Sequence, residues 1–311
     1  MRIAAIDCGT NSIRLLIAER EEGSTRLRQL LRRMEVVRLG QGVDARGEFA
    51  PQALERTFAA TRGFKQLLDE YAVEQIRFGA TSASRDAKNR DLFIAGIEEI
   101  LGVKPEVISG QEEAQLSFAG AISALEPIDG SSMLVDLGGG STEFVLGQQQ
   151  VQAAYSADIG CVRLSERCAV SAPLTAQQRQ QIRDEVEQAL SQVRQVVDFS
   201  KVDRLVGVAG TITTVCAQAL ALDSYDPEAI NGAELSLEQV QRAAEQLANM
   251  SVQERAALGF MHPGRVDVIG TGACIWSQIV TEVNAATGGA IKTVRVSEFD
   301  ILDGLALSLA L

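Results

Sequence analysis

Two segments of the sequence combine an aspartate with a short run of small and hydroxylated residues. The first is Ile6-Asp7-Cys8-Gly9-Thr10-Asn11-Ser12-Ile13, and the second is Val135-Asp136-Leu137-Gly138-Gly139-Gly140-Ser141-Thr142. Both read apolar-Asp-x-Gly-x-x-Ser. Small residues let the backbone approach an anion closely, and glycines can turn successive N–H groups inward. The two loops therefore predict phosphate sites made of Gly9, Thr10, Asn11, Ser12, Gly138, Gly139, Gly140, Ser141 and Thr142.

Carboxylates flank both loops, and neither loop contains a lysine. Asp7 opens the first loop, whereas Asp136 and Glu143 bracket the second. A metal ion is then the natural source of compensating charge, and such carboxylates suit Mg²⁺, often through water. We therefore expect Asp7, Asp136 and Glu143 to bind metal. Two hairpins with glycine turns and solvated acids would contain the same residue types, but the recurrence of one pattern in identical register favours phosphate.

The segment 108–114 offers a candidate general base. Ser109 and Glu112 form the S-x-x-E pattern of a capping box, with Ser109 as the N-cap of a helix. Glu113 then points about 100° further round the helix, where it is free to activate a water molecule. An acid in the first turn could instead do no more than complement the helix dipole. The residue types alone leave both interpretations of Glu113 open.

Arginines supply the other candidate phosphate contacts. Arg85 follows a predicted strand, where α/β sheets usually bind ligands, and its guanidinium could clamp phosphate oxygens; a solvated loop arginine is an equal alternative. The segment 206–214 reads as strand, glycine turn and helix, and its glycines suit either an anion site or close packing. The sequence also contains a basic run, which is more typical of a solvated strand face than of a surface that binds a polyanion. It consists of Arg26, Arg28, Arg32, Arg33 and Arg38.

Apolar runs on both sides of each phosphate loop predict a strand, a tight loop and a second strand. The matching arrangement in the two halves indicates a duplicated domain. Further strands are expected at 76–80, 106–108, 204–208 and 293–296, with a loop at 81–86. Helices are expected at 51–71, 91–101, 109–125, 174–197, 237–250, 266–284 and 301–311. Because strands and helices alternate, the predicted fold class is α/β.

Composition limits the function classes. The chain has 311 residues, enough for two domains, and a net charge of -12 from 41 acidic and 29 basic residues. Such an acidic surface argues against nucleic acid and anionic membranes as partners. The five cysteines show no C-x-x-C spacing and there is one histidine, so neither a zinc site nor a His-dependent triad is expected. Reduced thiols and the lack of a visible export signal predict a cytoplasmic protein.

Six stretches together resemble the exopolyphosphatase / guanosine pentaphosphate phosphatase family, within the actin / sugar kinase / Hsp70 fold superfamily. They occur in order across nearly all of the chain, at 6–16, 80–87, 109–114, 136–143, 160–166 and 207–211. The resemblance implies a duplicated, ribonuclease H-like α/β fold of two similar lobes with an interlobe cleft. The N-terminal lobe is expected at 1–120 and the C-terminal lobe at 121–299, with a closing helix at 300–311 packing back onto the first lobe.

The resemblance also implies roles for individual residues. Glu113 would activate the attacking water and Arg85 would contact phosphate. Both loops would hold phosphate, with Asp136 and Glu143 as partners of Mg²⁺; a monovalent cation could be required in addition. Longer family members carry an extra helical domain, so this chain is similar to the short, two-domain type.

The expected activity is that of an exopolyphosphatase, which hydrolyses the terminal phosphoanhydride of inorganic polyphosphate with Mg²⁺ and releases orthophosphate. One alternative keeps this chemistry but takes guanosine pentaphosphate (pppGpp) as substrate, with 207–214 near the nucleoside. An alternative of another class is a non-catalytic regulator that binds nucleotide or polyphosphate. A sugar kinase is less favoured, because no sugar-binding signature is found. We expect a homodimer, which is common for such enzymes, although no segment identifies an interface.

Overall fold

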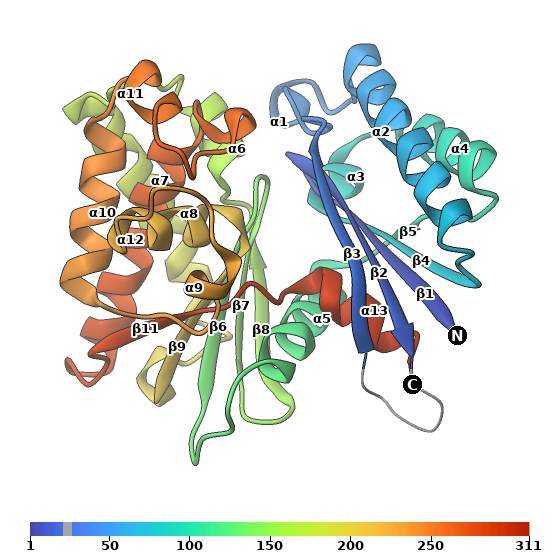
Figure 1. Cartoon of the computed structure of the whole chain (residues 1–311). Helices are drawn as coiled ribbons and strands as arrows, with labels where there is room; N and C mark the ends of the chain where they lie inside the picture. Colours follow the sequence, from blue (N-terminus) through green and yellow to red (C-terminus); the bar gives the residue numbers. More distant parts are fainter. Residues whose placement is uncertain (21–26, 311) are drawn as a thin grey trace. The chain divides into compact units, whose positions relative to one another are not determined.

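The computed structural model describes residues 1–20 and 27–310 (Figure 1). These residues divide into two compact units, the first made of Met1–Gly120 with Ile301–Leu311 and the second of Ala121–Asp300. Each unit has its own sheet and its own helices, and each is described by itself. Arg26 of the basic run lies outside the described residues. The interlobe cleft expected from the sequence stays a prediction.

The first unit is built on a five-stranded sheet in the order β3-β2-β1-β4-β5. Neighbours β1, β4 and β5 run parallel, whereas β2 is antiparallel to both β1 and β3. The strands are β1 (Arg2–Cys8), β2 (Ser12–Arg20), β3 (Leu27–Val36), β4 (Gln75–Ala80) and β5 (Glu106–Val107). The helices are α1 (Val43–Arg46), α2 (Pro51–Glu70), α3 (Ser82–Asp86), α4 (Arg90–Leu101), α5 (Gly110–Ser123) and α13 (Ile301–Ser308).

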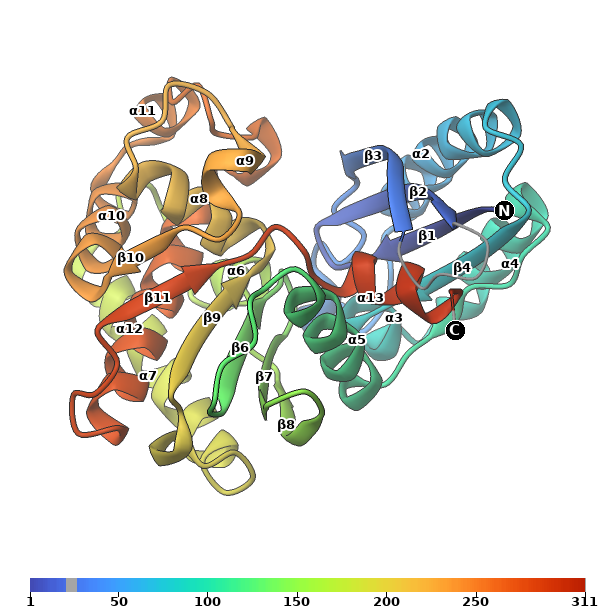
Figure 2. The same ribbon diagram turned by 60° about the horizontal axis from the view of Figure 1, so that its bottom comes forward.

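Strand β1 is buried on both faces. Ile6 belongs to a buried cluster that includes Phe64 of α2. Ala5, which points to the opposite face, joins a smaller cluster with Leu305 of α13. Figure 2 shows α13 beside the sheet of this unit. A strand covered on both sides needs a continuous apolar run, and this explains why 3–6 contains no polar residue. This packing fixes the carboxyl end of β1, from which the first phosphate loop begins.

The second unit is built on a six-stranded sheet in the order β10-β11-β9-β6-β7-β8. Its strands are β6 (Ser132–Leu137), β7 (Thr142–Gly147), β8 (Val151–Ala157), β9 (Arg204–Val208), β10 (Glu234–Ser236) and β11 (Thr293–Val296). Its helices are α6 (Cys161–Arg167), α7 (Ala176–Val193), α8 (Ala209–Ala219), α9 (Pro227–Ile230), α10 (Leu237–Asn249), α11 (Val252–Ala256) and α12 (Ile269–Ala286). Two short 3₁₀ turns lie at Phe199–Lys201 and Pro263–Arg265.

Close packing explains the presence of Gly207, for which the sequence left both an anion site and packing open. A Cβ on Gly207 of β9 would lie 2.7 Å from Ile212 Cγ2 and 2.9 Å from Trp276 Cζ2. Both neighbours are fully buried members of the core of this unit. The segment 206–214 thus forms the expected strand, turn and helix, and Gly207 is required there for packing between β9, α8 and α12.

The two sheets share one connectivity. The order β3-β2-β1-β4-β5 of the first unit corresponds to β8-β7-β6-β9-β11 of the second. In both, two antiparallel strands lie on one side of the first strand and two parallel strands on the other. Each phosphate loop joins the first strand to the second. The α/β class and the duplicated fold predicted from the sequence are confirmed.

Some local expectations were wrong. The segment 81–86, expected to be a loop, contains α3, which is too short to show a periodic pattern. The expected helix 174–197 begins at Ala176 and ends at Val193.

All five cysteines are free thiols, and Cys8, Cys161 and Cys216 are buried. Among the described residues, no helix is both long enough and apolar enough to cross a lipid bilayer.

Replacing Gly304 by alanine tests how closely α13 packs. A Cβ on Gly304 would lie 1.9 Å from the backbone oxygen of Leu116 in α5. Although alanine favours a helix by roughly 1 kcal/mol over glycine, we expect Gly304→Ala to lower the free energy of unfolding by roughly 1–3 kcal/mol, because α13 must shift. The matched control is Gly63→Ala in α2, where open space surrounds the glycine; this change should be neutral or stabilising. Urea unfolding measures both, and equal midpoints for the two variants would contradict the packing.

Candidate active site

The second phosphate loop, 138–141, is held from one side by the start of α6. The Gly138 carbonyl accepts a backbone N–H from the first residue of α6 at 3.1 Å, and the Gly139 carbonyl accepts those of the next two residues at 2.9 and 3.0 Å. In a trans peptide the carbonyl and the following N–H point in opposite directions. The N–H groups of Gly139 and Gly140 therefore point away from α6.

Three N–H groups of this loop are available to a ligand. Those of Gly139, Gly140 and Ser141 have no acceptor within the described part of the chain. Gly140 and Ser141 are buried, and a buried backbone donor normally has a partner. Successive N–H groups that point the same way form an anion-binding nest. The loop can therefore bind phosphate oxygens through its backbone alone.

The first phosphate loop is held in a similar way by the segment that follows β3. The Thr10 carbonyl accepts the N–H of Gly40 at 2.8 Å, and the Asn11 carbonyl accepts those of Val37 and Arg38 at 3.1 and 2.8 Å. Thr10 Oγ1 is buried and has no partner among the residues described. Leaving such a hydroxyl without a partner costs roughly 1–3 kcal/mol. A phosphate oxygen would satisfy it.

The two hairpins differ in the residue that faces the loop aspartate. Asp7 of β1 lies directly opposite Arg14 of β2, whose Nε and Nη2 donate to Asp7 Oδ2 at 2.9 and 2.6 Å. Asp136 of β6 lies instead opposite Glu143 of β7. Directly opposed residues share one face, with Cβ atoms roughly 5 Å apart. Two carboxylates with exposed fractions of 6% and 1% therefore lie side by side in the second unit.

The Asp136 and Glu143 carboxylates fit a divalent cation. Like charges opposite each other repel, and Mg²⁺ is usually bound by one or two carboxylates, with water and substrate phosphates completing its shell. Within 1–20 and 27–310, no three His, Cys, Asp or Glu residues are grouped to hold a metal. Asp7 would have to share its carboxylate with Arg14, and its metal role stays a prediction.

Glu113 is buried in the first turn of α5 and is held by Arg85. Arg85 Nη1 donates to Glu113 Oε2 at 2.6 Å and to the Ile108 carbonyl at 3.2 Å. Glu113 exposes 7% of its surface. Burial raises the pKa of Glu113 to about 7, because it outweighs the opposing effect of the Arg85 cation. A carboxylate that titrates near neutral pH is suited to act as a general base.

The two adjacent glutamates of α5 have separate partners. Ser109 caps the helix as predicted, since its hydroxyl accepts the Glu112 N–H at 3.1 Å. The Glu112 carboxylate does not return this bond among the described residues but accepts from Arg77 Nη2 at 2.8 Å. The reciprocal half of the capping box was therefore wrong. Glu112 remains half-exposed in an ion pair, whereas Glu113 is turned inward toward Arg85.

The structure brings together two candidate site residues that the sequence analysis proposed separately, and it shows further contacts that the sequence analysis did not predict. Arg85 and Glu113, expected as independent contacts, form one ion pair. The loop-holding segments at 37–40 and at the start of α6 had not been assigned any role. The pairing of Asp7 with Arg14 was also missed, although a signal existed. Asp136 and Glu143 have the same spacing, and a common spacing across two hairpins indicates a common register.

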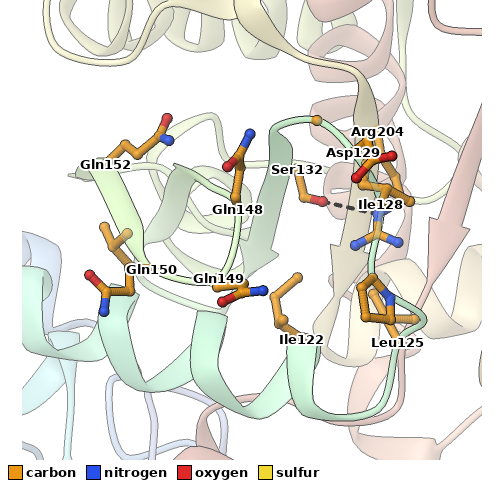
Figure 3. Close-up of a pocket in the computed structure, with 13 residues that line it drawn as sticks. Ile122, Leu125, Ile128, Asp129, Ser132, Gln148, Gln149, Gln150, Gln152 and Arg204 are labelled. Carbon is orange, nitrogen blue, oxygen red and sulfur yellow. Dashed lines mark hydrogen bonds between the residues drawn. The ribbon is translucent and has the colours of Figure 1, made fainter.

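A cavity of about 680 Å³ lies at the opposite end of the second sheet (Figure 3). It is lined by the first residues of β6 and β9, Ser132 and Arg204, and by glutamines of the turn between β7 and β8. Arg204 Nε donates to Ser132 Oγ at 3.0 Å. The phosphate loop follows the carboxyl end of β6, whereas this cavity lies at its amino end. The cavity is therefore not part of the candidate active site.

Comparisons with known proteins identify the family. Residues 16–307 match the Ppx/GppA phosphatase family. The chain belongs to this family. It is 47% identical to Exopolyphosphatase 2 of Mycobacterium tuberculosis, over 99% of this chain and 98% of the relative.

Solved structures agree with this Ppx/GppA membership. The crystal structure of an exopolyphosphatase-like protein has a TM-score of 0.95 and 41% identity, covering 100% of this chain and 99% of the other. An exopolyphosphatase from Cytophaga hutchinsonii has a TM-score of 0.91 and 27% identity, covering 100% and 98%. The family resemblance found in the sequence is confirmed.

Glu143→Gln tests the carboxylate pair in this Ppx/GppA phosphatase. The change keeps an acceptor for Ser156 Oγ, which donates to Glu143 Oε1 at 2.7 Å, but removes one of the two charges. Mg²⁺ should stabilise the unchanged protein by about 2.7 kcal/mol at 100 times its Kd and should stabilise the variant much less. Differential scanning calorimetry with Mg²⁺ or EDTA measures both; Glu112→Gln is the control. A full Mg²⁺ response in Glu143→Gln would contradict the assignment.

Proposed function

We propose that this protein is an exopolyphosphatase that uses Mg²⁺ and releases orthophosphate from the end of inorganic polyphosphate. The observation that carries the proposal is the buried Glu113–Arg85 pair in a chain with two phosphate loops. A base beside a cation suits the attack of water on a phosphoryl group. The name of the full-length relative from Mycobacterium tuberculosis, Exopolyphosphatase 2, supports polyphosphate as the substrate class.

The proposed mechanism begins with binding of the terminal phosphoryl group. The N–H groups of the second loop and Thr10 Oγ1 of the first would donate to its oxygens, and Arg85 would add a cation. Phosphoryl transfer spreads charge over these oxygens, so donors that are already oriented stabilise the transition state. When bound by Asp136 and Glu143, Mg²⁺ would supply further positive charge.

Glu113 carries the proton in the chemical step. Its carboxylate accepts a proton from a water molecule as the water oxygen bonds to the terminal phosphorus. The bond from that phosphorus to the bridging oxygen breaks, and the bridging oxygen leaves with the shortened chain. Arg85 holds Glu113 Oε2 throughout, which keeps the carboxylate oriented. The products are orthophosphate and a chain with one phosphate fewer.

Two alternatives differ in substrate or in class. Hydrolysis of pppGpp would use the same residues, but the names of the relatives favour polyphosphate. A non-catalytic polyphosphate-binding regulator would need the loops but not a buried base. Of the two glycines in 206–214, Gly207 is explained by packing, and a nucleoside contact by this segment stays a prediction.

A substrate panel tests the proposed activity. Phosphate release from polyphosphates of several lengths and from pppGpp should be measured with Mg²⁺ under identical conditions. We expect the highest kcat/KM with polyphosphate and loss of release in EDTA. A higher kcat/KM with pppGpp than with polyphosphate would make pppGpp the preferred substrate. Tight calorimetric binding of polyphosphate without any hydrolysis would favour the regulator.

Glu113→Gln tests the proposed base. The variant cannot accept the proton, so its kcat should fall by roughly 10²–10⁴-fold. The kcat of Glu112→Gln should stay close to that of the unchanged protein. Burial raises the pKa of Glu113 to about 7, so the active, deprotonated form is lost as pH falls below about 7. The kcat/KM of the unchanged protein should therefore decrease about tenfold per pH unit below 7 and level off above it. The residual activity of Glu113→Gln should not decrease in this way below pH 7. If the variant shows the same decrease, Glu113 is not the base.

Cellular location and assembly stay predictions from the sequence. Five free thiols support the predicted cytoplasmic location, because reducing compartments keep thiols reduced. The predicted homodimer stays a prediction. Light scattering of the purified protein measures its mass directly.

A further inference from the structure

The third carbonyl of the second phosphate loop is held by a side chain. Arg163 of α6 donates from Nε to the Gly140 carbonyl at 2.6 Å. The Arg163 side chain exposes only 10% of its surface, and its Nη2 lies 3.9 Å from Asp158 Oδ1. The Asp158 side chain is 79% exposed, so solvent weakens that ion pair. The bond to Gly140 is charge-assisted and shielded from water, and such bonds are stronger than neutral ones.

This bond fixes the orientation of the peptide group that joins Gly140 and Ser141. With its carbonyl directed at Arg163, the following N–H points the opposite way. All three loop carbonyls are then held by α6, and the three N–H groups that follow them point away from it. If the Gly140 carbonyl were released, the peptide group could rotate, because glycine accepts a wide range of backbone angles. An oxygen would then replace an N–H at the anion site.

The start of α6 lies close enough to the loop to hold its carbonyls only because residue 160 is glycine. A Cβ on Gly160 would lie 2.4 Å from the Gly139 oxygen and 2.7 Å from the Gly140 nitrogen. Both of these atoms belong to the backbone, so they cannot move aside without changing the loop. The contact between α6 and the loop is thus set by Gly160 and completed by Arg163.

We propose that Arg163 is a positioning residue for phosphate binding, which orients the Gly140–Ser141 peptide so that the Ser141 N–H faces the bound phosphoryl group. Arg163 acts through the loop and does not touch the substrate. The inference rests on the proposed function, because it assigns the bound group as the terminal phosphoryl group of the substrate.

Arg163→Met is the direct test, since methionine fills similar space without a donor. Removal of one oriented donor from such a site costs roughly 10²–10³-fold in kcat, so we expect kcat/KM for polyphosphate to fall roughly 10²-fold. Binding of inorganic phosphate, measured by calorimetry with Mg²⁺, should weaken in parallel. Arg163→Lys keeps one donor and should recover part of both losses. Arg167→Met is the matched control, because Arg167 lies on the same helix and pairs with Glu185 at 2.7 Å.

Thermal midpoints separate positioning from folding. We expect those of Arg163→Met and Arg167→Met to be similar, so that only the first loses phosphate binding. If Arg163→Met does not fold, the comparison of Arg163→Lys with Arg167→Met decides. Phosphate affinity and kcat/KM within twofold of Arg167→Met would overturn the inference. The calorimetric measurement does not require hydrolysis, so a protein that binds phosphate but hydrolyses no polyphosphate would refute the proposed activity and still test Arg163.

Discussion

The direction of three peptide groups in the loop 138–141 is the constraint on which the candidate site depends. An acidic protein with a net charge of -12 can hold a polyanion only where local donors are concentrated. The loop contains no cationic side chain, so its donors are backbone N–H groups. These can face an anion together only if the carbonyls face elsewhere. Helix α6 provides that arrangement by donating its first N–H groups to the carbonyls of Gly138 and Gly139.

Duplication produced two hairpins with the same backbone but different charges. In the first unit, Arg14 neutralises Asp7 across the strand pair. In the second unit, the equivalent position holds Glu143, which lies opposite Asp136. The residue directly opposite the loop aspartate is therefore a cation in the first hairpin and a second buried carboxylate in the second. This difference is why we propose Mg²⁺ for the second hairpin.

Local features of the site could be predicted from the sequence. The two loops and their flanking strands follow from glycine, hydroxyl and apolar patterns within a few residues. Ser109 was recognised as a cap because capping depends on adjacent residues, and this recognition separated Glu113 from Glu112. The family resemblance supplied the fold and the expected chemistry. All of these features depend on short-range sequence patterns or on motifs that recur in relatives.

Contacts between distant segments could not be predicted. The start of α6 holds the second loop mainly through backbone N–H groups, which every residue except proline possesses, so no residue type signals the contact. The same holds for the bond from Gly40 to the Thr10 carbonyl. The partner of Glu112 was missed because Arg77 lies on another strand. The helix α3 was missed because five residues are too few to show helical periodicity.

Amide chemical shifts provide the most direct measurement of the central claim. Isotope-labelled protein should be titrated with inorganic phosphate in the presence of Mg²⁺. We expect the amide protons of Gly139, Gly140 and Ser141 to move downfield together and to saturate at one phosphate concentration, while that of Gly147, at the far end of β7, does not move. Phosphate binding that leaves the three loop amides unchanged would contradict that claim.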